Sequence, residues 1–201
     1  IAVGRLPAAN LTEATALVDK IIAYDSDPSF LRDWKNRISF VADDEDNNLH
    51  FYDAEGVASV SSQRDSVYNL EKIYLDAFKQ VSTSGGERYP DAKNALLDNL
   101  FKGVFVMNYL GHGGEDGWTQ ERIFTSSDIN ALNNSDKLPL FITATCSFGP
   151  HDDPTNVSAG ELLLLNPNGG AISLLTTVRV VIASHNERLV RNTFNVVFNK
   201  N

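Results

Sequence analysis

The stretch "LPLFITATCSFG", residues 138–149, decides the fold of this chain of 201 residues. Apolar side chains dominate it from Leu138 to Ala144 and do not alternate cleanly with polar ones. Such a run is typical of a strand that is buried on both faces of a parallel sheet. Cys146, the only cysteine, follows at once, and small or turn-forming residues come after it. The stretch therefore predicts a buried strand over 138–146 that ends on a single thiol.

Other segments repeat this pattern on both sides of the stretch. Strands are predicted at 37–43 ("RISFVAD"), 103–111 ("GVFVMNYLG") and 169–177 ("GGAISLLTT"). Amphipathic or apolar patterns predict helices at 10–25, 66–81, 90–102, 126–132, 158–166 and 185–198. The first of these has Asn10 and Glu13 at the spacing of a capping box. Strands that alternate with helices indicate an α/β fold, with a mainly parallel sheet and helices on both faces.

Composition and charge exclude several classes of protein. The net charge of −9 argues against non-specific binding of nucleic acid, which requires clustered Lys and Arg. No apolar run approaches the roughly 18 to 20 residues of a membrane span. A single cysteine excludes an internal disulfide. The chain opens with "IAVGRLP", without Met or a signal peptide, so we expect one domain, residues 1–201, from a longer protein.

A histidine stands at the end of the strand predicted at 103–111, as Cys146 does at 138–146. His112 lies between Gly111 and Gly113. Chemistry in open α/β sheets is found beyond the carboxyl ends of the strands. A neighbouring base makes a thiol a useful nucleophile, and backbone N–H groups after the His and at Cys146 could form an oxyanion hole. The pair therefore favours a cysteine peptidase.

The same residues also allow other interpretations. A lone cysteine in an apolar strand is more often a core residue, and a histidine between glycines is often only part of a turn. Trp118 either lines a cleft or fills the core. His50, His151 and His185 share no metal-ligand spacing, and a zinc site from His112, Glu115 and His151 is a remote alternative. The acidic loop at 43–48 offers oxygen ligands for calcium (Asp43, Asp44, Glu45 and Asp46), but without EF-hand spacing, so we expect no metal and no cofactor.

Several blocks of the sequence resemble one known family. "MNYLGHGGEDGW" (107–118), "LPLFITATCSFG" (138–149) and "VGRLPAAN" (3–10) resemble the gingipain-like cysteine peptidases of the caspase-like clan. The block at 169–194 is most similar to the PorU-type sortases of the type IX secretion system. The resemblance runs nearly end to end. It implies a caspase/gingipain-like three-layer sandwich.

The resemblance also implies roles for individual residues. Cys146 would be the nucleophile and His112 the base and acid, with the backbone of Gly113 and Cys146 as oxyanion donors. An acidic residue after the early strand would assist the His, which points to Glu45, with Asp44 as a rival. The family's substrate pocket falls on Thr177, Arg179 and Asn47, and the neutral Asn47 predicts that substrates with Arg or Lys are rejected.

The function implied is that of a sortase. Such an enzyme cleaves C-terminal sorting domains from exported polypeptides through a thioester and transfers the product to an amine of anionic lipopolysaccharide. This implies polypeptide substrates, partners in the type IX secretion system, and export to the bacterial outer membrane. A secreted gingipain-like endopeptidase that only hydrolyses, or a non-catalytic caspase-like binding module, are the alternatives.

Overall fold

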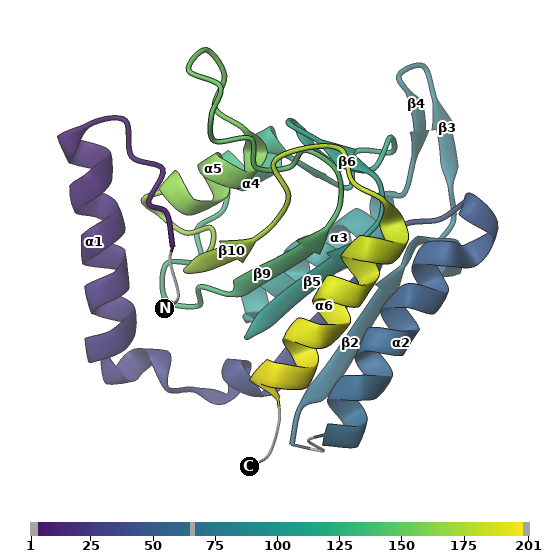
Figure 1. The fold of residues 1–201 in the computed structure, drawn as a ribbon, viewed down its shortest axis with the longest axis horizontal. Helices are drawn as coiled ribbons and strands as arrows, with labels where there is room; N and C mark the ends of the chain where they lie inside the picture. Colours follow the sequence, from purple (N-terminus) through teal and green to yellow (C-terminus); the bar gives the residue numbers. More distant parts are fainter. Residues whose placement is uncertain (1–3, 65–66, 199–201) are drawn as a thin grey trace.

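A parallel five-stranded sheet forms the centre of the protein. The computed structural model describes residues 4–64 and 67–198. The strands lie in the order β10–β9–β5–β1–β2, and each neighbouring pair is parallel (Figure 1). Their bounds are β1 Arg37–Ala42, β2 Asn69–Tyr74, β5 Val106–Leu110, β9 Leu140–Ala144 and β10 Ser173–Leu175. The predicted α/β fold with a mainly parallel sheet is confirmed.

Helices cover both faces of this sheet. The helices are α1 Leu11–Ser26, α2 Leu49–Arg64, α3 Pro90–Lys102, α4 Ser126–Asn130, α5 Ala159–Leu165 and α6 Ala183–Val197. In Figure 1, α2 and α6 lie in front of the sheet and α3 lies behind it. The helices α4 and α5 pack with α3 into the same apolar cluster, and α1 stands beside α5 at the far side of β10.

The sheet separates the two larger of the three apolar clusters in the described residues. Successive residues of a strand point to opposite faces, so one buried strand serves both. Phe40 and Val106 pack with the helices α2 and α6, whereas Val41 and Met107 pack with α3. All four side chains are fully buried. This explains why the strands read as continuous apolar runs in the sequence.

Short elements that the sequence did not predict complete the fold. Strands β3 Val81–Thr83 and β4 Gly86–Arg88 form a hairpin. A small antiparallel sheet, β6 Gly113–Gly114, β7 Gly117–Trp118 and β8 Phe124–Thr125, directly follows His112. Within the described residues, 3₁₀ turns cover Pro28–Phe30, Asp33–Asn36, Asp46–Asn48 and Leu75–Ala77. The turn at Asp46–Asn48 becomes important at the candidate site.

The helix predicted at 66–81 is wrong. The described part of this segment contains the edge strand β2 and a 3₁₀ turn; Ser66 lies outside the described residues. Leu70, Ile73 and Tyr74 follow a helical spacing, which misled the prediction. As an edge strand, β2 is only partly covered, and burial is confined to its end, at Ile73 and Tyr74. Pairing with β1 makes this segment a strand in spite of its helical spacing of apolar residues.

Helix α2 was missed for the opposite reason. Apart from His50 in its first turn, the side chains that it buries are small: Ala54, Val57, Ala58 and Ser61. They recur with helical spacing, but small residues give a weak hydrophobic signal. Gly56 lies against the Arg191 side chain of α6, where a Cβ atom would sit too close to the guanidinium. The small residues therefore allow α2 and α6 to pack closely on one face of the sheet.

The other predicted helices and strands are present, but the strands are shorter than predicted, most of all at 169–177, where only Ser173–Leu175 is a strand. The helix at 90–102 has the predicted bounds, and α1 begins one residue later than predicted. Asn10 caps α1 by accepting a hydrogen bond from the Glu13 N–H, while the Glu13 carboxylate accepts from the N–H groups of Ala9 and the Asn10 amide. Among the described residues, no helix has the length and apolar character needed to cross a membrane.

Candidate active site

The register of β5 and β9 brings His112 and Cys146 to one edge of the sheet. Leu110 pairs with Ala144, and the Gly111 N–H donates to the Ala144 carbonyl at 3.2 Å. His112 and Cys146 each lie two residues beyond this pair in neighbouring parallel strands. Both therefore emerge at the carboxyl end of the sheet, where loops carry the chemistry of α/β proteins.

The backbone of His112 is fixed from two directions. Its N–H donates to Oδ2 of Asp43, the residue that follows β1, at 2.8 Å. Its carbonyl accepts a hydrogen bond from the Tyr109 hydroxyl. Trp118 stacks on Tyr109 with ring centroids 4.2 Å apart and is fully buried. Trp118 therefore belongs to the core, where it supports the loop from below.

The imidazole of His112 contacts an acidic residue, but not the predicted one. His112 Nε2 lies 2.7 Å from Asp46 Oδ2. In the described part of the chain, no hydrogen bond joins Glu45 to His112, and the Glu45 side chain is exposed. Asp44, the rival, is buried and accepts a hydrogen bond from the Tyr89 hydroxyl at 2.6 Å. The structure thus places Asp46 where the sequence analysis placed Glu45.

The backbone of the acidic loop explains this shift. Glu45, Asp46, Asn47 and Asn48 all have positive φ, between 42° and 63°. Non-glycine residues seldom adopt this region, and Asp and Asn do so more readily than others. Four such residues in succession curl the loop back over the sheet edge. The side chains of this loop cannot be placed correctly if the backbone after β1 is assumed to be extended.

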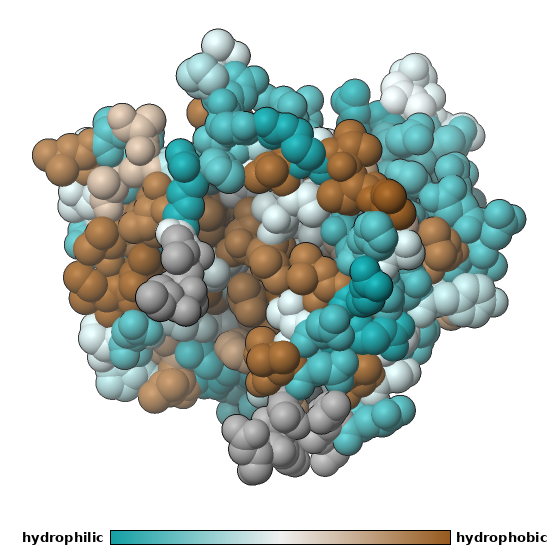
Figure 2. Space-filling view, in the orientation of Figure 1, coloured by the Kyte–Doolittle hydropathy of each residue, from teal (hydrophilic) through white to brown (hydrophobic). Residues whose placement is uncertain are grey.

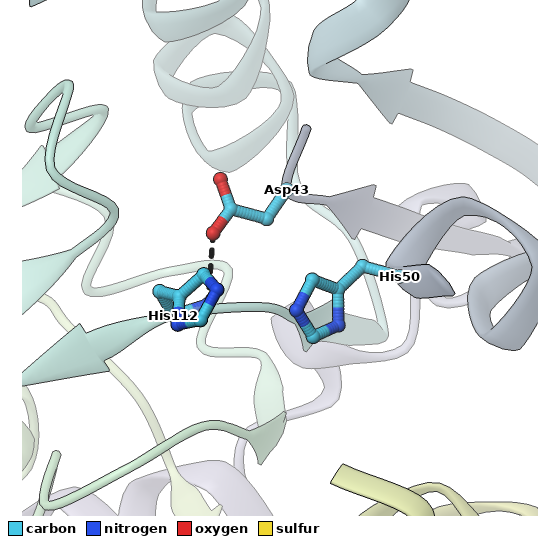
Figure 3. A group of neighbouring side chains, drawn as sticks. All are labelled: Asp43, His50 and His112. Carbon is cyan, nitrogen blue, oxygen red and sulfur yellow. Dashed lines mark hydrogen bonds between the residues drawn. The ribbon is translucent and has the colours of Figure 1, made fainter. Parts of the chain in front are cut away.

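A second histidine lies beside the first. His50, in the first turn of α2, is 6% exposed, and its ring meets that of His112 edge-on, with centroids 5.2 Å apart (Figure 3). Its Nε2 is 3.4 Å from the same Asp46 oxygen that contacts His112. Burial and the neighbouring His112 lower the pKa of His50. The sequence analysis set His50 aside because His50, His151 and His185 share no metal-ligand spacing.

Three carboxylates form a buried cluster close to this pair of histidines. Oxygen atoms of Asp43, Asp44 and Glu121 lie within 4.8 Å of one another. Burial raises the pKa of Asp43 to about 7, against the hydrogen bond from the His112 N–H, and Asp44 adds to the increase. Burial also raises the pKa of Glu121, with a further contribution from Asp44. Asp43 therefore accepts the hydrogen bond that holds the His112 backbone, although burial makes ionisation of the Asp43 carboxyl group unfavourable.

Cys146 is held mainly by backbone contacts. Its side chain is partly buried, and Sγ lies 3.9 Å from the Val181 carbonyl oxygen. The next residue, Ser147, has φ of 45°, and its N–H donates to the Arg179 carbonyl at 3.2 Å. Among the described groups, the Cys146 N–H has no hydrogen-bond partner. It is available to a ligand at the strand end, as an oxyanion donor requires.

Glycines beside His112 permit close packing at the predicted oxyanion site. A Cβ atom on Gly113 would lie 2.5 Å from Thr145 Oγ1 and 3.0 Å from the Gly117 carbonyl oxygen. A Cβ on Gly111 would lie 2.4 Å from the Asp43 Cβ. The contacts with Thr145 and Asp43 are shorter than atoms tolerate, so neither glycine position accepts a side chain without movement of its neighbours. The loops that bear His112 and Cys146 are thereby packed against each other.

The residues predicted to bind substrate have different surroundings. The Thr177 hydroxyl donates to the Thr145 carbonyl, so it ties down the segment that leads to Cys146. Arg179 is exposed and forms a bidentate pair with Asp152, in the loop after β9. Asn47 is exposed beside Asp46. Their role in substrate binding remains a prediction.

A cavity of about 800 Å³ opens beside His112. It is formed by the small sheet and the turn after it, within residues 112–127, and Glu115 and Asp116 are among the residues that line it. The remote zinc alternative is not supported by placement, since in the described residues His112, Glu115 and His151 do not converge. The loop carboxylates proposed for calcium also separate: Asp43 and Asp44 face Glu121, whereas Asp46 faces His112.

Comparison with known proteins identifies the family. A family model described as peptidase family C25 matches residues 1–201. The chain belongs to peptidase family C25. This is the family of the gingipains, so the predicted family is confirmed, while the closer relation to PorU-type sortases remains a prediction. No curated protein matches the chain.

Solved structures share the fold of this C25 domain. A complex of the pro- and mature domains of Porphyromonas gingivalis RgpB has a TM-score of 0.80 at 17% identity, covering 98% of this chain and 45% of that one. Gingipain R, described as an Arg-specific cysteine proteinase, gives 0.80 at 16% identity, with 97% and 44% covered. A structure described as a protease gives 0.65 at 19% identity, with 90% and 37% covered. The chain spans less than half the length of these proteins, and identities this low show the fold alone.

Proposed function

We propose that this C25 domain is the catalytic part of a cysteine peptidase with Cys146 as nucleophile and His112 as general acid and base. The register of β5 and β9 carries this proposal, because it sets both residues two positions beyond a paired strand end. The unpartnered N–H of Cys146 supports it further. Asp46 takes the role of the acidic residue that orients the imidazole and stabilises its charged form.

The chemistry follows from these positions. The thiol of Cys146 gives its proton to His112, and the sulfur attacks the peptide carbonyl carbon. The carbonyl oxygen gains negative charge, which the N–H groups of Cys146 and Gly113 stabilise. His112 then protonates the leaving amine, and a thioester remains on Cys146. Water or an amine attacks the thioester, and the thiol regains its proton.

We infer that the acceptor is an amine, as in a PorU-type sortase. Two features support this. The block at 169–194 resembles those sortases, and the cavity beside His112 offers room for an acceptor at the open side of the site. Glu115 and Asp116 on its wall attract a cationic amine group. The substrates would be exported polypeptides with C-terminal sorting domains, the acceptor anionic lipopolysaccharide, and the location the outer membrane with other type IX secretion components.

A thiol-directed peptide probe tests the peptidase proposal. A substrate-like acyloxymethyl ketone should label Cys146 in the wild type and should not label the His112→Ala variant at a comparable rate. Denatured protein serves as the control, because it exposes the thiol without the site. Equal labelling of folded wild type, folded variant and denatured chain would show a non-catalytic module with an ordinary cysteine.

A competition between acceptors tests the sortase inference. The full-length protein is given a sorting-domain substrate with increasing amine or lipopolysaccharide, and the products are weighed by mass spectrometry. Amine-linked product that grows with acceptor concentration is expected, since water and amine compete for one thioester. Hydrolysed product alone, with the acceptor present, would instead assign a gingipain-like endopeptidase.

A further inference from the structure

Two histidines and a carboxylate converge at the carboxyl end of β1 and β5. One potential ligand atom from each of Asp43, His50 and His112 lies within 4.8 Å of the other two. Figure 3 shows His50 and His112 side by side, with the Asp43 carboxylate above His112. The three residues come from separate elements, since Asp43 follows β1, His50 lies in the first turn of α2 and His112 follows β5. Proximity of this kind is not visible in the spacing of the sequence.

One nitrogen in this group is buried and unsatisfied. His50 is 6% exposed, and its Nε2 has no hydrogen-bond partner among the described residues. That atom lies 3.4 Å from Asp46 Oδ2 without the geometry of a hydrogen bond, and the same oxygen contacts His112 Nε2 at 2.7 Å. Buried polar atoms nearly always have a partner. The unsatisfied nitrogen of His50 therefore lies beside the Asp46 carboxylate, and one ligand atom of His50 lies within 4.8 Å of those of Asp43 and His112.

We propose that His50, His112 and Asp43 form a binding site for a divalent transition-metal ion, best suited to Zn²⁺, with Asp46 as the fourth ligand. Two imidazole nitrogens with carboxylate oxygens are the donors that Zn²⁺ accepts, whereas Ca²⁺ and Mg²⁺ favour oxygen alone. Asp43 already accepts hydrogen bonds from the N–H groups of His112 and Asp44, which orient its carboxylate. Each carboxylate oxygen has a second lone pair available for the ion.

Metal binding here would switch off the site, a consequence that rests on the proposed function. A Zn²⁺ ion on His112 occupies the imidazole that must accept the thiol proton, and it removes Asp46 from its orienting contact. Micromolar Zn²⁺ is therefore expected to inhibit the peptidase reversibly, with recovery on adding a chelator. The site differs from a zinc ion held between His112 and the Cys146 thiolate, which is the obvious rival.

The test measures binding in the Cys146→Ala background, so that the thiol and the peptidase activity do not contribute. Isothermal titration with ZnCl₂ should give one site per chain, and CaCl₂ should give no heat. His50→Gln in this background should weaken Zn²⁺ binding at least tenfold, because one of the ligands is lost. The matched control, His185→Gln, replaces an exposed histidine in α6 and should bind Zn²⁺ unchanged.

A second readout guards against unfolding of the variants. Co²⁺ in place of Zn²⁺ gives visible absorption that should change in intensity with His50→Gln, and thermal unfolding of the same samples reports whether the fold is kept. If His50→Gln unfolds the chain, Asp46→Asn, at an exposed loop position, takes its place with the same expectation.

Each outcome separates the metal site from the proposed function. Loss of Zn²⁺ binding in Cys146→Ala, with binding kept in the His50→Gln single variant, would place the ion between His112 and Cys146 and overturn the proposal. No binding to any variant would overturn it as well. If Zn²⁺ binding depends on His50 but the wild type has no peptidase activity, the metal site is supported and the proposed function is contradicted. Binding without inhibition of an active peptidase would contradict the inhibitory role.

Discussion

The loop that carries His112 and the loop that carries Cys146 leave neighbouring strands at the same sheet edge, yet they are held in different ways. His112 is fixed by acidic side chains, with Asp43 on its backbone and Asp46 on its ring. Cys146 is fixed by backbone pairing, through Ser147 and Gly149 to the carbonyls of Arg179 and Thr177. The position of His112 thus depends on which side chains surround it, whereas the position of Cys146 depends on the backbone path of its loop.

The largest effect should come from removing the thiol. Cys146→Ala should lower kcat/KM by at least about 1,000-fold, since the covalent route is lost. The fold should be kept, because Sγ has only a long contact with the Val181 carbonyl. Peptide cleavage assays and thermal unfolding measure the two quantities. A large fall in Tm would show that Cys146 is a packing residue. The loop that carries it would then depend on side-chain contacts, as the His112 loop does.

The next effect separates the two acidic candidates on the His112 side. Asp46→Asn should lower kcat/KM by about 10- to 100-fold, because the imidazole loses the carboxylate that orients it. The matched control is Glu45→Gln, one residue earlier and exposed, which should change activity less than about threefold. Steady-state kinetics decide between them. A stronger effect at Glu45 would restore the residue that the sequence indicated.

The pH dependence of stability should reveal the buried carboxylate. The pKa of Asp43 is about 7 in the folded protein, above its ordinary value of 3.8. Between these values the folded state binds more protons than the unfolded state, so the contribution of Asp43 to stability falls as pH rises from about 4 to about 7 and is constant above.

Asp43→Asn removes this ionisation. In buffer with EDTA, the Tm of the variant minus that of the wild type should therefore rise by several degrees between about pH 5 and pH 8. Asp136→Asn, at an exposed carboxylate in the segment before β9, is the control, and its difference should change much less with pH. A difference for Asp43→Asn that falls with pH would mean that Asp43 is ionised below its ordinary range.

The smallest effect concerns the Cys146 side. Arg179 pairs with Asp152 at the surface, so neither charge is free to select a substrate. A peptide library should show no preference for Arg or Lys before the cut. Arg179→Ala should raise cleavage after basic residues by a few-fold, because Asp152 is then unpaired, and the stability of the fold should change little. Strong cleavage after Arg or Lys by the wild type would contradict this account of the pocket.

The sequence predicted the parts of the fold that burial determines. The strands at 138–146 and 103–111 read as continuous apolar runs because both faces of the sheet are covered, and their ends gave the dyad candidates His112 and Cys146. The edge strand β2 was mistaken for a helix because a half-covered strand need not be apolar throughout. Helix α2 was missed because, apart from His50, its buried residues are small.

The side chains around His112 could not be placed from the sequence for a geometric reason. The loop at 45–48 follows left-handed backbone conformations, and these set which carboxylate reaches the ring. His50 comes within reach of His112 only because α2 starts directly after that loop. The Asp- and Asn-rich composition of the loop was a signal for such a backbone, since these residues tolerate positive φ.

The central claim is that His112 and Cys146 act as one unit, and a double-mutant cycle tests it most directly. The values of kcat/KM are measured for the wild type, Cys146→Ala, His112→Ala and the double variant with one peptide substrate. If the two residues form one catalytic unit, the double variant should be about as slow as Cys146→Ala alone. A double variant that is slower than either single variant by the product of their separate effects would show that the two residues act independently, and would contradict the account.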